Sequence, residues 1–306
     1  MPLGANQMTT TTGASFIPQM WLDEIRRATE ANLLAKNIVK HFAVQGKKGD
    51  TVHVPDLSNL TANVKAANTQ VTLQAPTETE FTMTIGTHIE TSFLVEDITA
   101  AQSQYNLRSE YTSKASYAIA QNVDSAIMAQ YANLTASVIG GDGVTPWAAA
   151  AAGNGTDLTD VGIRNMIQTL EDANVPSKDW ALVIPPSQKN ALLGIQKFSE
   201  YISTGERGAA AGGNLGKVGS GAWGELYGIP VFVTTQCPTV LAADGLTSYR
   251  VGMLLHKDAL VLAMQVAPRV QAQYKQEYLG TLVTVDTIYG VATFRANFGV
   301  AFYAPL

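Results

Sequence analysis

The strand pattern that begins at Phe81 most constrains what this chain can fold into. Apolar side chains occupy the odd positions Phe81, Met83, Ile85, Ile89, Phe93 and Val95. Polar side chains occupy the even positions Thr82, Thr84, His88, Glu90, Ser92 and Glu96. This period of two predicts one long β-strand with a single wet face.

A second arm precedes this strand, so residues 46–90 are predicted to form a two-armed β excursion. A glycine-bounded polar turn leads into a strand from Thr51 to Pro55, and residues 56–80 are mostly polar. Arms of about 20 residues at ~3.3 Å per residue reach up to ~65 Å. A compact domain made from the whole chain has a radius of gyration of only ~19 Å. Because a lone hairpin is marginal in water, we expect this one to lie across another subunit.

A long helix is predicted next. Its apolar side chains recur every three or four residues, at Leu107, Tyr111, Ala115, Ile119, Val123, Ile127, Tyr131 and Leu134. Asn106 is a candidate cap, and neither Gly nor Pro interrupts the pattern before Gly140. About 28 residues make a rod of ~42 Å, far longer than the usual helix. A long helix beside a long strand predicts an elongated body.

The rest of the chain mixes helices and strands and ends in strands. Helices are expected over residues 17–37, 159–173 and 187–198. Strands are expected over residues 180–184, 228–234, 251–256, 259–266, 280–291 and 296–304. Loops are expected over residues 140–156 and over the glycine-rich residues 203–224. This order indicates the α+β class, since a doubly wound sheet alternates strands and helices regularly.

Composition excludes several classes of function. Charged residues make up 15% of the 306 residues, against roughly 25% in ordinary domains, and such a surface suits coverage by neighbouring copies. The net charge is -5, and no basic stripe for gripping DNA phosphates is visible. No apolar run approaches the ~20 residues of a membrane span. The polar N-terminus lacks the apolar region of a signal peptide, so we expect a protein made in a cytoplasm and not exported.

The stretch GSGAWG, residues 219–224, has the spacing of a dinucleotide-binding turn, and Gly216-Lys217 resembles the end of a P-loop. A dinucleotide turn follows a strand and opens a helix. Here a glycine-rich loop precedes the stretch and a strand follows it. The P-loop fails as well, because Ala211 and Val218 stand where Gly and Ser or Thr are required. We therefore predict that these glycines serve loop geometry.

Other chemistry is not supported by local spacing. The four histidines, His41, His53, His88 and His256, form no metal-binding motif. The single cysteine, Cys237, is predicted to be a small buried hydrophobe, and His88 a solvated or interface side chain. The acidic pairs Glu78/Glu80, Glu96/Asp97 and Glu171/Asp172 are expected on solvated faces. A catalytic set assembled from distant residues stays open, but no G-x-S-x-G elbow supports one. We predict no catalytic, cofactor-binding or metal-binding residue, no cofactor, and no enzymatic activity.

Seven stretches of the chain occur in a recognisable order: GKKGDTVHVPDLSNLTANV (46–64), VEDITAAQSQYNL (95–107), EYTSKASYAIAQNVDSAIM (110–128), ALVIPPSQKNALL (181–193), GELYGIPVFVT (224–234), LLHKDALVLAMQ (254–265) and YGVATFRANFGVAF (289–302). In these motifs and their order, the chain resembles the major capsid proteins of tailed double-stranded DNA bacteriophages with the Hong Kong 97-type fold. This resemblance implies an N-terminal arm (1–45), an extended loop (46–90), a peripheral domain with a long spine helix (91–134 and 251–306) and an axial domain (135–250).

The resemblance also implies partners. Copies are expected to form the hexamers and pentamers of an icosahedral virion shell, assembled in the bacterial host cytoplasm. The shell encloses double-stranded DNA without sequence-specific binding. A separate scaffolding protein and a portal are implied, and a decoration protein is an open option. No membrane is involved. Lys65 and Asn297 match no motif for a crosslink between subunits, and we predict none.

Two alternatives belong to other classes. A nanocompartment shell of the encapsulin type shares this fold and contains a cargo enzyme instead of DNA. An α+β enzyme has a site that is not visible in the sequence. Particle size separates the enzyme from both shells.

Overall fold

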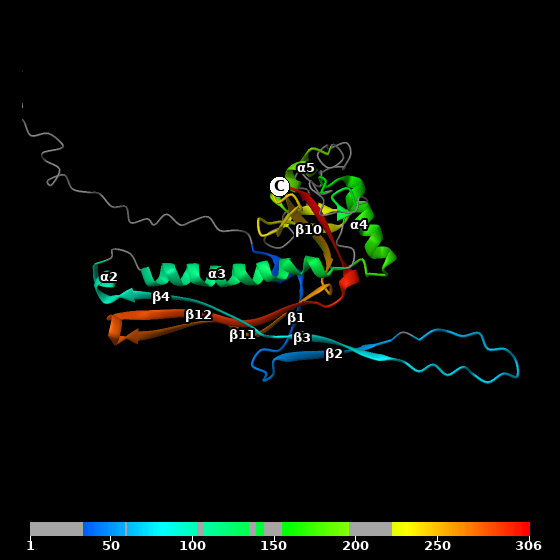
Figure 1. Ribbon diagram of the computed structural model, residues 1–306, viewed down its shortest axis with the longest axis horizontal. Helices are drawn as coiled ribbons and strands as arrows, with labels where there is room; N and C mark the ends of the chain where they lie inside the picture. Colours follow the sequence, from blue (N-terminus) through cyan, green and yellow to red (C-terminus); the bar gives the residue numbers. More distant parts are fainter. Residues whose placement is uncertain (1–32, 59, 103–106, 135–138, 144–154, 196–221) are drawn as a thin grey trace, which may run out of the picture.

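The computed structural model describes residues 33–306, except residue 59 and residues 103–106, 135–138, 144–154 and 196–221. It contains a four-stranded sheet with a long helix along it, a seven-stranded sheet, and a two-stranded hairpin that projects from the body (Figure 1). This combination is of the α+β class, as predicted. None of the helices within these ranges is both long and apolar enough to cross a membrane.

The four-stranded sheet is built around a long antiparallel ribbon. Its order is β1 (Lys40–Phe42), β11 (Leu260–Lys275), β12 (Gly280–Thr293) and β4 (Thr87–Glu96). The register of β11 against β12 shifts twice between Met264 and Arg269, and Pro268 lies in that stretch. Inside a sheet proline is confined to edges and bulges because it has no N–H to donate. The sequence predicts β11 only to Val266, because Pro268 and the charged Arg269 follow it, but the strand continues beyond the bulge to Lys275.

The long helix α3 (Leu107–Met128) lies along one face of this sheet (Figure 1). Ala115 and Ile119 are buried against Val285 of β12, with Ile89 and Phe93 of β4 beside them. Five residues of the predicted apolar face are buried: Ala115, Ile119, Val123, Ile127 and Leu134. The helix has 22 residues, or ~33 Å, and is shorter than predicted because a 3-10 turn, η2 (Ala129–Asn133), follows it.

The seven-stranded sheet holds the main core. Its order is β5 (Ile139–Gly140), β13 (Gly299–Pro305), β10 (Ser248–His256), β6 (Trp180–Ile184), β8 (Ile229–Val233) and β7 (Ala222–Leu226), with β9 (Thr239–Leu241) pairing β10. Every residue of β6 is buried. The predicted strands over 180–184 and 228–234 are confirmed.

Two helices accompany this sheet, α4 (Asp160–Asp172) and α5 (Pro186–Leu193). The Thr159 hydroxyl accepts a hydrogen bond of 3.0 Å from Gly162 N and caps α4, as its position before the apolar pattern suggests. Met166 and Leu170 are fully buried. The helix predicted over 159–173 is confirmed, and α5 ends earlier than the helix predicted over 187–198.

The single long strand predicted from Phe81 is wrong in one respect: it is two strands. β3 (Glu78–Thr84) pairs with β2 (Thr51–Leu57), whereas β4 pairs with β12. Between them the chain crosses Gly290, where a Cβ atom would lie 2.6 Å from the Thr84 carbonyl oxygen. Met83 and Ile85 are both buried, so the alternation of side chains continues up to the crossing and does not reveal it.

The predicted two-armed excursion is present, with shorter paired arms than expected. β2 and β3 pair over seven residues, from Thr51–Thr84 to Leu57–Glu78. Residues 58–77 continue outward as a long loop without strand pairing in its described part (Figure 1). Polar side chains and a lack of alternation in this stretch leave no apolar face on which a sheet could form.

The strand pairing crosses the boundaries of the predicted regions at several places. β1 lies in the predicted N-terminal arm and the start of β4 in the predicted extended loop, yet both pair within the four-stranded sheet. Residues 251–306 were assigned to the peripheral domain, yet β13 and most of β10 pair within the seven-stranded sheet. The helix expected over 17–37 lies largely outside the described residues, and only α1 (Ala35–Ile38) is seen at its end. Asn106 and most of the loop 203–224 also lie outside them.

Candidate subunit-contact surfaces

The loop of residues 58–77 is held by a few side-chain bonds rather than by a backbone ladder. Thr61 N donates 2.9 Å to Oε1 of Gln74, whose Nε2 donates in return to the Thr61 carbonyl oxygen. Ser58 Oγ accepts from Thr77 N at 3.1 Å. Asn68, at the tip, adopts φ 58°, a left-handed conformation that Asn tolerates better than most residues. These contacts keep the loop narrow and extended.

Apolar side chains of this loop have no cover within the described chain. Those of the loop are Leu60, Val64, Val71 and Leu73, and Leu57 at the end of β2 adjoins them; each is at least 58% exposed. The only charged residue between positions 58 and 77 is Lys65. Several exposed apolar side chains on one projecting segment are typical of an interaction surface. The sequence prediction described this stretch as polar with few apolar anchors, and therefore missed these residues as contacts.

The base of the hairpin is fastened to the four-stranded sheet by an aromatic cluster. The Phe294 ring stands edge-on to Phe81 of β3 at 5.1 Å and to Phe42 of β1 at 5.7 Å. Met83 and Ile85 are buried with Val261 and Ala263 beside this cluster. These contacts fix the base of the hairpin to the four-stranded sheet.

A side-chain amide holds the turn that enters the hairpin. Gln265 Nε2 lies 2.8 Å from both the Lys47 and the Gly49 carbonyl oxygens. Gly46 N donates 3.1 Å to the Gln265 carbonyl oxygen. The turn GKKGD is therefore tied to β11, a strand more than 200 residues further along the chain.

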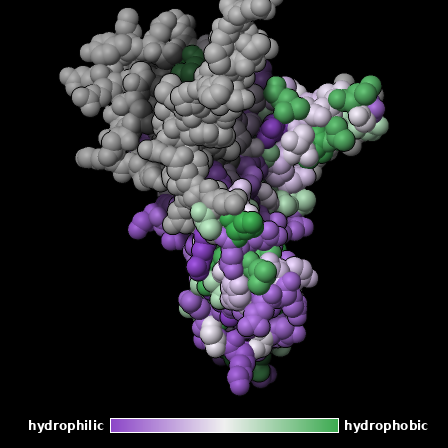
Figure 2. Space-filling model, turned by 90° about the vertical axis from the view of Figure 1, so that its left-hand side faces the viewer, coloured by the Kyte–Doolittle hydropathy of each residue, from purple (hydrophilic) through white to green (hydrophobic). Residues whose placement is uncertain are grey.

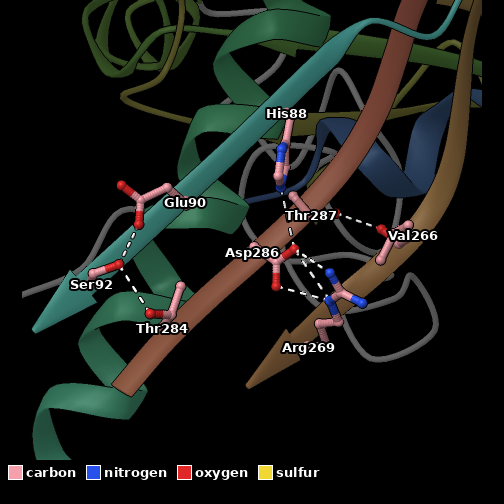
Figure 3. Close-up of polar contacts among 8 residues, drawn as sticks. All are labelled: His88, Glu90, Ser92, Val266, Arg269, Thr284, Asp286 and Thr287. Atoms are coloured by element: carbon pink, nitrogen blue, oxygen red, sulfur yellow. Dashed lines mark hydrogen bonds and ion pairs between the residues drawn. The ribbon is translucent and has the colours of Figure 1, made fainter. Parts of the chain in front are cut away.

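A polar cluster lies on the face of the four-stranded sheet opposite α3 (Figure 3). Arg269 of β11 makes a two-pronged ion pair with Asp286 of β12, with Nε–Oδ1 and Nη2–Oδ2 distances of 2.9 Å. His88 Nε2 of β4 lies 3.3 Å from Asp286 Oδ2. The Asp286 side chain is 8% exposed, whereas Arg269 and His88 are more than half exposed. The hydrogen bond from Arg269 holds the pKa of Asp286 below its ordinary value, with burial opposing it.

This cluster is structural in character. It joins three neighbouring strands just beyond the bulge at Pro268, where Thr287 Oγ1 also donates 2.7 Å to the Val266 carbonyl oxygen. Arg269 donates hydrogen bonds to both oxygens of the Asp286 carboxylate. The pKa of Asp286 is lowered, whereas a general acid needs a raised pKa. The cluster fixes the irregular part of the ribbon, and His88 is largely exposed, as predicted.

The far end of the four-stranded sheet carries a second group of exposed apolar side chains. The most exposed are Ile98, Tyr278 and Leu279, each above 60%. Figure 2 looks at this end, where separate apolar groups appear among hydrophilic side chains in the lower half of the view. Asp97 N donates 2.9 Å to the Leu279 carbonyl oxygen, and Tyr274 Oη donates 2.7 Å to Asp97 Oδ2. The turn is thus tied to the start of α2 (Asp97–Gln102).

The histidines and the other candidate site residues do not come together in one site among the described residues. The four histidines lie in β1, β2, β4 and β10, and no metal-binding group of three His, Cys, Asp or Glu side chains occurs in the part of the chain that the structure describes. All three acidic pairs are exposed, as predicted. The end of GSGAWG lies in β7, which turns through Tyr227-Gly228 into β8. A strand therefore stands where a dinucleotide-binding turn requires a helix.

Cys237 is 3% exposed, and burial raises the pKa of its thiol to about 12. At neutral pH it therefore holds its proton and lacks the thiolate that nucleophilic chemistry needs. The prediction of a small buried hydrophobe is confirmed.

A family model for phage capsid proteins matches residues 82–300. The chain belongs to the phage capsid protein family. It is a major capsid protein, a component of the virion shell. The match includes α3, the polar cluster and most strands of the two larger sheets, but not β1 and little of β13.

Solved structures agree with this capsid protein in fold. It is 22% identical to a chain of Mycobacterium phage Che8, with a TM-score of 0.73 over 94% of this chain and 97% of that one. It is 18% identical to a chain from the capsid of cyanophage P-SCSP1u, with a TM-score of 0.74 and coverages of 99% and 96%. For the capsid of Ralstonia phage GP4 the values are 13%, 0.72, 94% and 96%.

The predicted Hong Kong 97-type fold is confirmed by these likenesses. No match was found among curated protein sequences. The family and the capsid structures favour neither the nanocompartment shell nor the enzyme.

Proposed function

We propose that this capsid protein assembles into the hexamers and pentamers of an icosahedral phage head that encloses double-stranded DNA. The observation that carries the proposal is the loop 58–77, whose apolar side chains are not covered by any part of the chain that the structure describes. Laid over a neighbouring subunit, the loop would bury Leu60, Val64 and Leu73, with Lys65 as the one charged residue of the loop. Many such contacts, each weak, add up over a closed shell.

The loop also fits a heterologous contact between copies. It projects from one side of the body, away from both sheets (Figure 1), so its receiving surface differs from the loop itself. Head-to-tail contacts of this kind close into rings when the rotation between copies allows it. Hexamers and pentamers are such rings.

The regions of the chain have corresponding roles in the proposal. Residues 1–45 serve as the N-terminal arm and 46–90 as the extended loop. Residues 91–134 and 251–306 supply the peripheral domain, and 135–250 the axial domain around the centre of each ring. Within this scheme β10 and β13 join the two domains, since they belong to the later segment but pair in the seven-stranded sheet.

The protein acts in the proposal by assembly and not by catalysis. A net charge of -5 would keep the packaged DNA from adhering strongly to the shell. A separate scaffolding protein and a portal take part in assembly in the host cytoplasm. No crosslink between Lys65 and Asn297 is expected.

A loop-deletion variant tests the proposal. Leu57 and Glu78 form the last pair of the hairpin, so residues 58–77 can be replaced by a two-residue Asn-Gly turn, which suits such a hairpin. We expect a folded subunit, by circular dichroism and cooperative thermal unfolding, that forms no shells by electron microscopy or light scattering. Shells of normal size and yield would contradict the role of the loop.

Two further variants separate loop length from apolar contact. Leu60→Ser, Val64→Ser and Leu73→Ser together keep the loop at full length but remove its apolar groups, and should also prevent shell formation. Leu241→Ser with Leu246→Ser changes exposed apolar side chains on another turn and should leave shells intact.

A further inference from the structure

A groove at the root of the extended hairpin is not filled by any described side chain. It has a volume of about 620 Å³, within the ~300–1,000 Å³ typical of pockets that bind ligands. One wall is the strand pair at Pro55, Asp56 and Phe81, and the other is the segment that carries Phe294, Arg295 and Phe298. Three phenyl rings and a proline line it together with polar side chains, among them Asp56, Arg295 and Asn297. The groove therefore suits an apolar side chain that is flanked by charged or polar groups.

Arg295 is the cation of this groove. Its guanidinium lies over the Phe298 ring at 4.9 Å and over the Phe294 ring at 5.7 Å. Within the described residues it makes no ion pair. Stacking on two rings restrains the guanidinium, and its donors remain available for a carboxylate. Asp56, on the opposite wall, supplies one negative charge.

The far end of the ribbon has the complementary chemistry. The turn between β11 and β12 presents Tyr278 and Leu279, which are 63% and 66% exposed. Glu277 beside them is exposed and has no ion pair among the described residues, and Lys275 lies two residues before it. The turn therefore offers an aromatic ring, an aliphatic side chain, an anion for Arg295 and a cation for Asp56.

The turn is also held in place before any partner arrives. Leu279 adopts a left-handed φ of 44°, and its carbonyl oxygen accepts from Asp97 N. Tyr274 in turn donates to the Asp97 carboxylate. A preorganised turn loses little conformational entropy on docking.

The turn cannot reach the groove of its own chain. β12 runs from Gly280 at the turn to Thr293 beside the groove, a strand of 14 residues, or ~45 Å. Pairing with β11 and β4 along its length keeps it extended, so the turn cannot fold back to the groove. The occupant must therefore come from another molecule.

We propose that the groove between Phe81 and Arg295 receives the turn Glu277–Leu279 of a second copy of this chain. This inference deepens the proposed function and rests on it, because it needs a self-assembling shell. The complementary surfaces lie at opposite ends of β12, so each copy uses its turn on one neighbour and its groove on another. Such head-to-tail contacts propagate around a ring or between rings.

Two other exposed apolar segments of a second copy fit the groove less well. The extended loop carries only Lys65 as a charge, so it cannot neutralise Arg295. The turn before β10 carries the exposed Leu246, but its Asp244 carboxylate already accepts bonds of 2.9 Å from Leu246 N and Thr247 N. Glu277, by contrast, stands beside the exposed Tyr278 and Leu279 and makes no ion pair among the described residues.

Cysteine cross-linking tests the contact directly. One preparation carries Tyr278→Cys and a second carries Asn297→Cys, which lines the groove. The native Cys237 is buried, with a thiol pKa of about 12, and should not form disulfides under mild oxidation. On mixing and mild oxidation we expect a disulfide-linked species of twice the 32.5 kDa chain mass, which neither preparation forms alone. Leu246→Cys mixed with Asn297→Cys is the matched control and should give none.

Charge exchange gives a second readout. Arg295→Glu and Glu277→Arg should each raise the protein concentration needed for half-maximal assembly by about tenfold. The two substitutions in one chain should restore assembly, because each interface then contains both changes. Restoration by the double variant cannot arise from misfolding of the single ones.

The outcomes distinguish this contact from the proposed function. No disulfide above the Leu246 control, with or without shells, overturns the contact. A disulfide between Asn297→Cys and Val64→Cys in place of Tyr278→Cys also overturns it and assigns the groove to a neighbour's extended loop. Failure of the unsubstituted protein to form shells under any condition counts against the proposed function instead, whatever the disulfide shows.

Discussion

The main-chain N–H of Ala35 donates a hydrogen bond of 2.7 Å to Oδ1 of Asp124, 89 residues further along the chain. Ala35 begins α1, and Asp124 lies in the second half of α3. Helix N-termini leave N–H groups without an acceptor, and the carboxylate supplies one to α1. The second oxygen, Oδ2, is buried and has no hydrogen-bond partner among the described residues. The segment where the N-terminal part of the chain meets α3 is therefore fastened by a buried acid.

Asp124 predicts a pH dependence of stability. Burial raises its pKa above the ordinary 3.8, while bonds from Ala35, Leu34 and Lys36 partly oppose this. The native state then holds the proton more tightly than the unfolded chain, so stability falls as pH rises from the ordinary pKa through the raised one. Asp124→Asn keeps an acceptor for Ala35 and should abolish this fall. Urea unfolding midpoints of the unassembled protein, measured from about pH 4 to 7, should show the variant gaining on the wild type as pH rises.

Asp124→Ala is the control for the hydrogen bond itself. It removes the acceptor and should lower the free energy of unfolding by about 1–3 kcal/mol. Parallel pH profiles for wild type and Asp124→Asn would contradict the assigned titration.

The Arg269–Asp286 pair predicts the opposite dependence. The pKa of Asp286 is lowered, first by its hydrogen bond from Arg269. Its stabilising contribution is present above the ordinary pKa of 3.8 and is lost as pH falls through the lowered one. Arg269→Gln should therefore raise the pKa of Asp286, which a carboxyl carbon titration by NMR can follow, and shift acid unfolding to higher pH. Arg269→Lys should recover part of the effect, because lysine keeps the charge without the two-pronged geometry. An unchanged Asp286 titration in Arg269→Gln would refute the pairing.

The contacts of the Phe294 ring should stabilise the base of the hairpin against local unfolding. Phe294 packs edge-on against Phe42 and Phe81, and it is half-buried. Phe294→Ala should cost about 2 kcal/mol, less than the ~3–5 kcal/mol of a fully buried phenylalanine. The loss should appear as faster amide hydrogen exchange in β2 and β3, with β10 unaffected. Phe294→Leu, which keeps an apolar group, should show a smaller change, and equal acceleration in β10 would argue against a local root.

The close approach of Phe302 to Gly252 leaves no room for a larger side chain at position 252 in the seven-stranded sheet. Gly252 is paired directly with Phe302, and a Cβ atom at Gly252 would lie 2.2 Å from Cζ of that ring. Gly252→Ala should lower the free energy of unfolding by about 1–3 kcal/mol through overpacking. Combination with Phe302→Leu should cost less than the sum of the two single changes. Gly86→Ala is the control, since its Cβ would meet nothing closer than 3.9 Å. Equal thermal stability of Gly252→Ala and wild type would contradict the prediction.

Much of the fold follows from local patterns. The helical spacing at Ala115, Ile119, Val123 and Ile127 marks the buried face of α3, because burial of one stripe repeats with the turn of the helix. The alternation from Phe81 assigns side chains to faces correctly. It does not show that β3 and β4 belong to different sheets, since alternation reports the face of a side chain and not the strand that pairs with it.

The sequence by itself determined the α+β class, the long helix, the projecting hairpin and the capsid family, all of which rest on periodicity, composition and motif order. The tertiary structure alone decided the contact surfaces and buried charges. The groove joins Phe81 to Arg295, the ion pair joins β11 to β12 past a bulge, and Asp124 caps a helix 89 residues away. Such relationships depend on chain segments that meet only after folding, and no local pattern in the sequence encodes which segments those are.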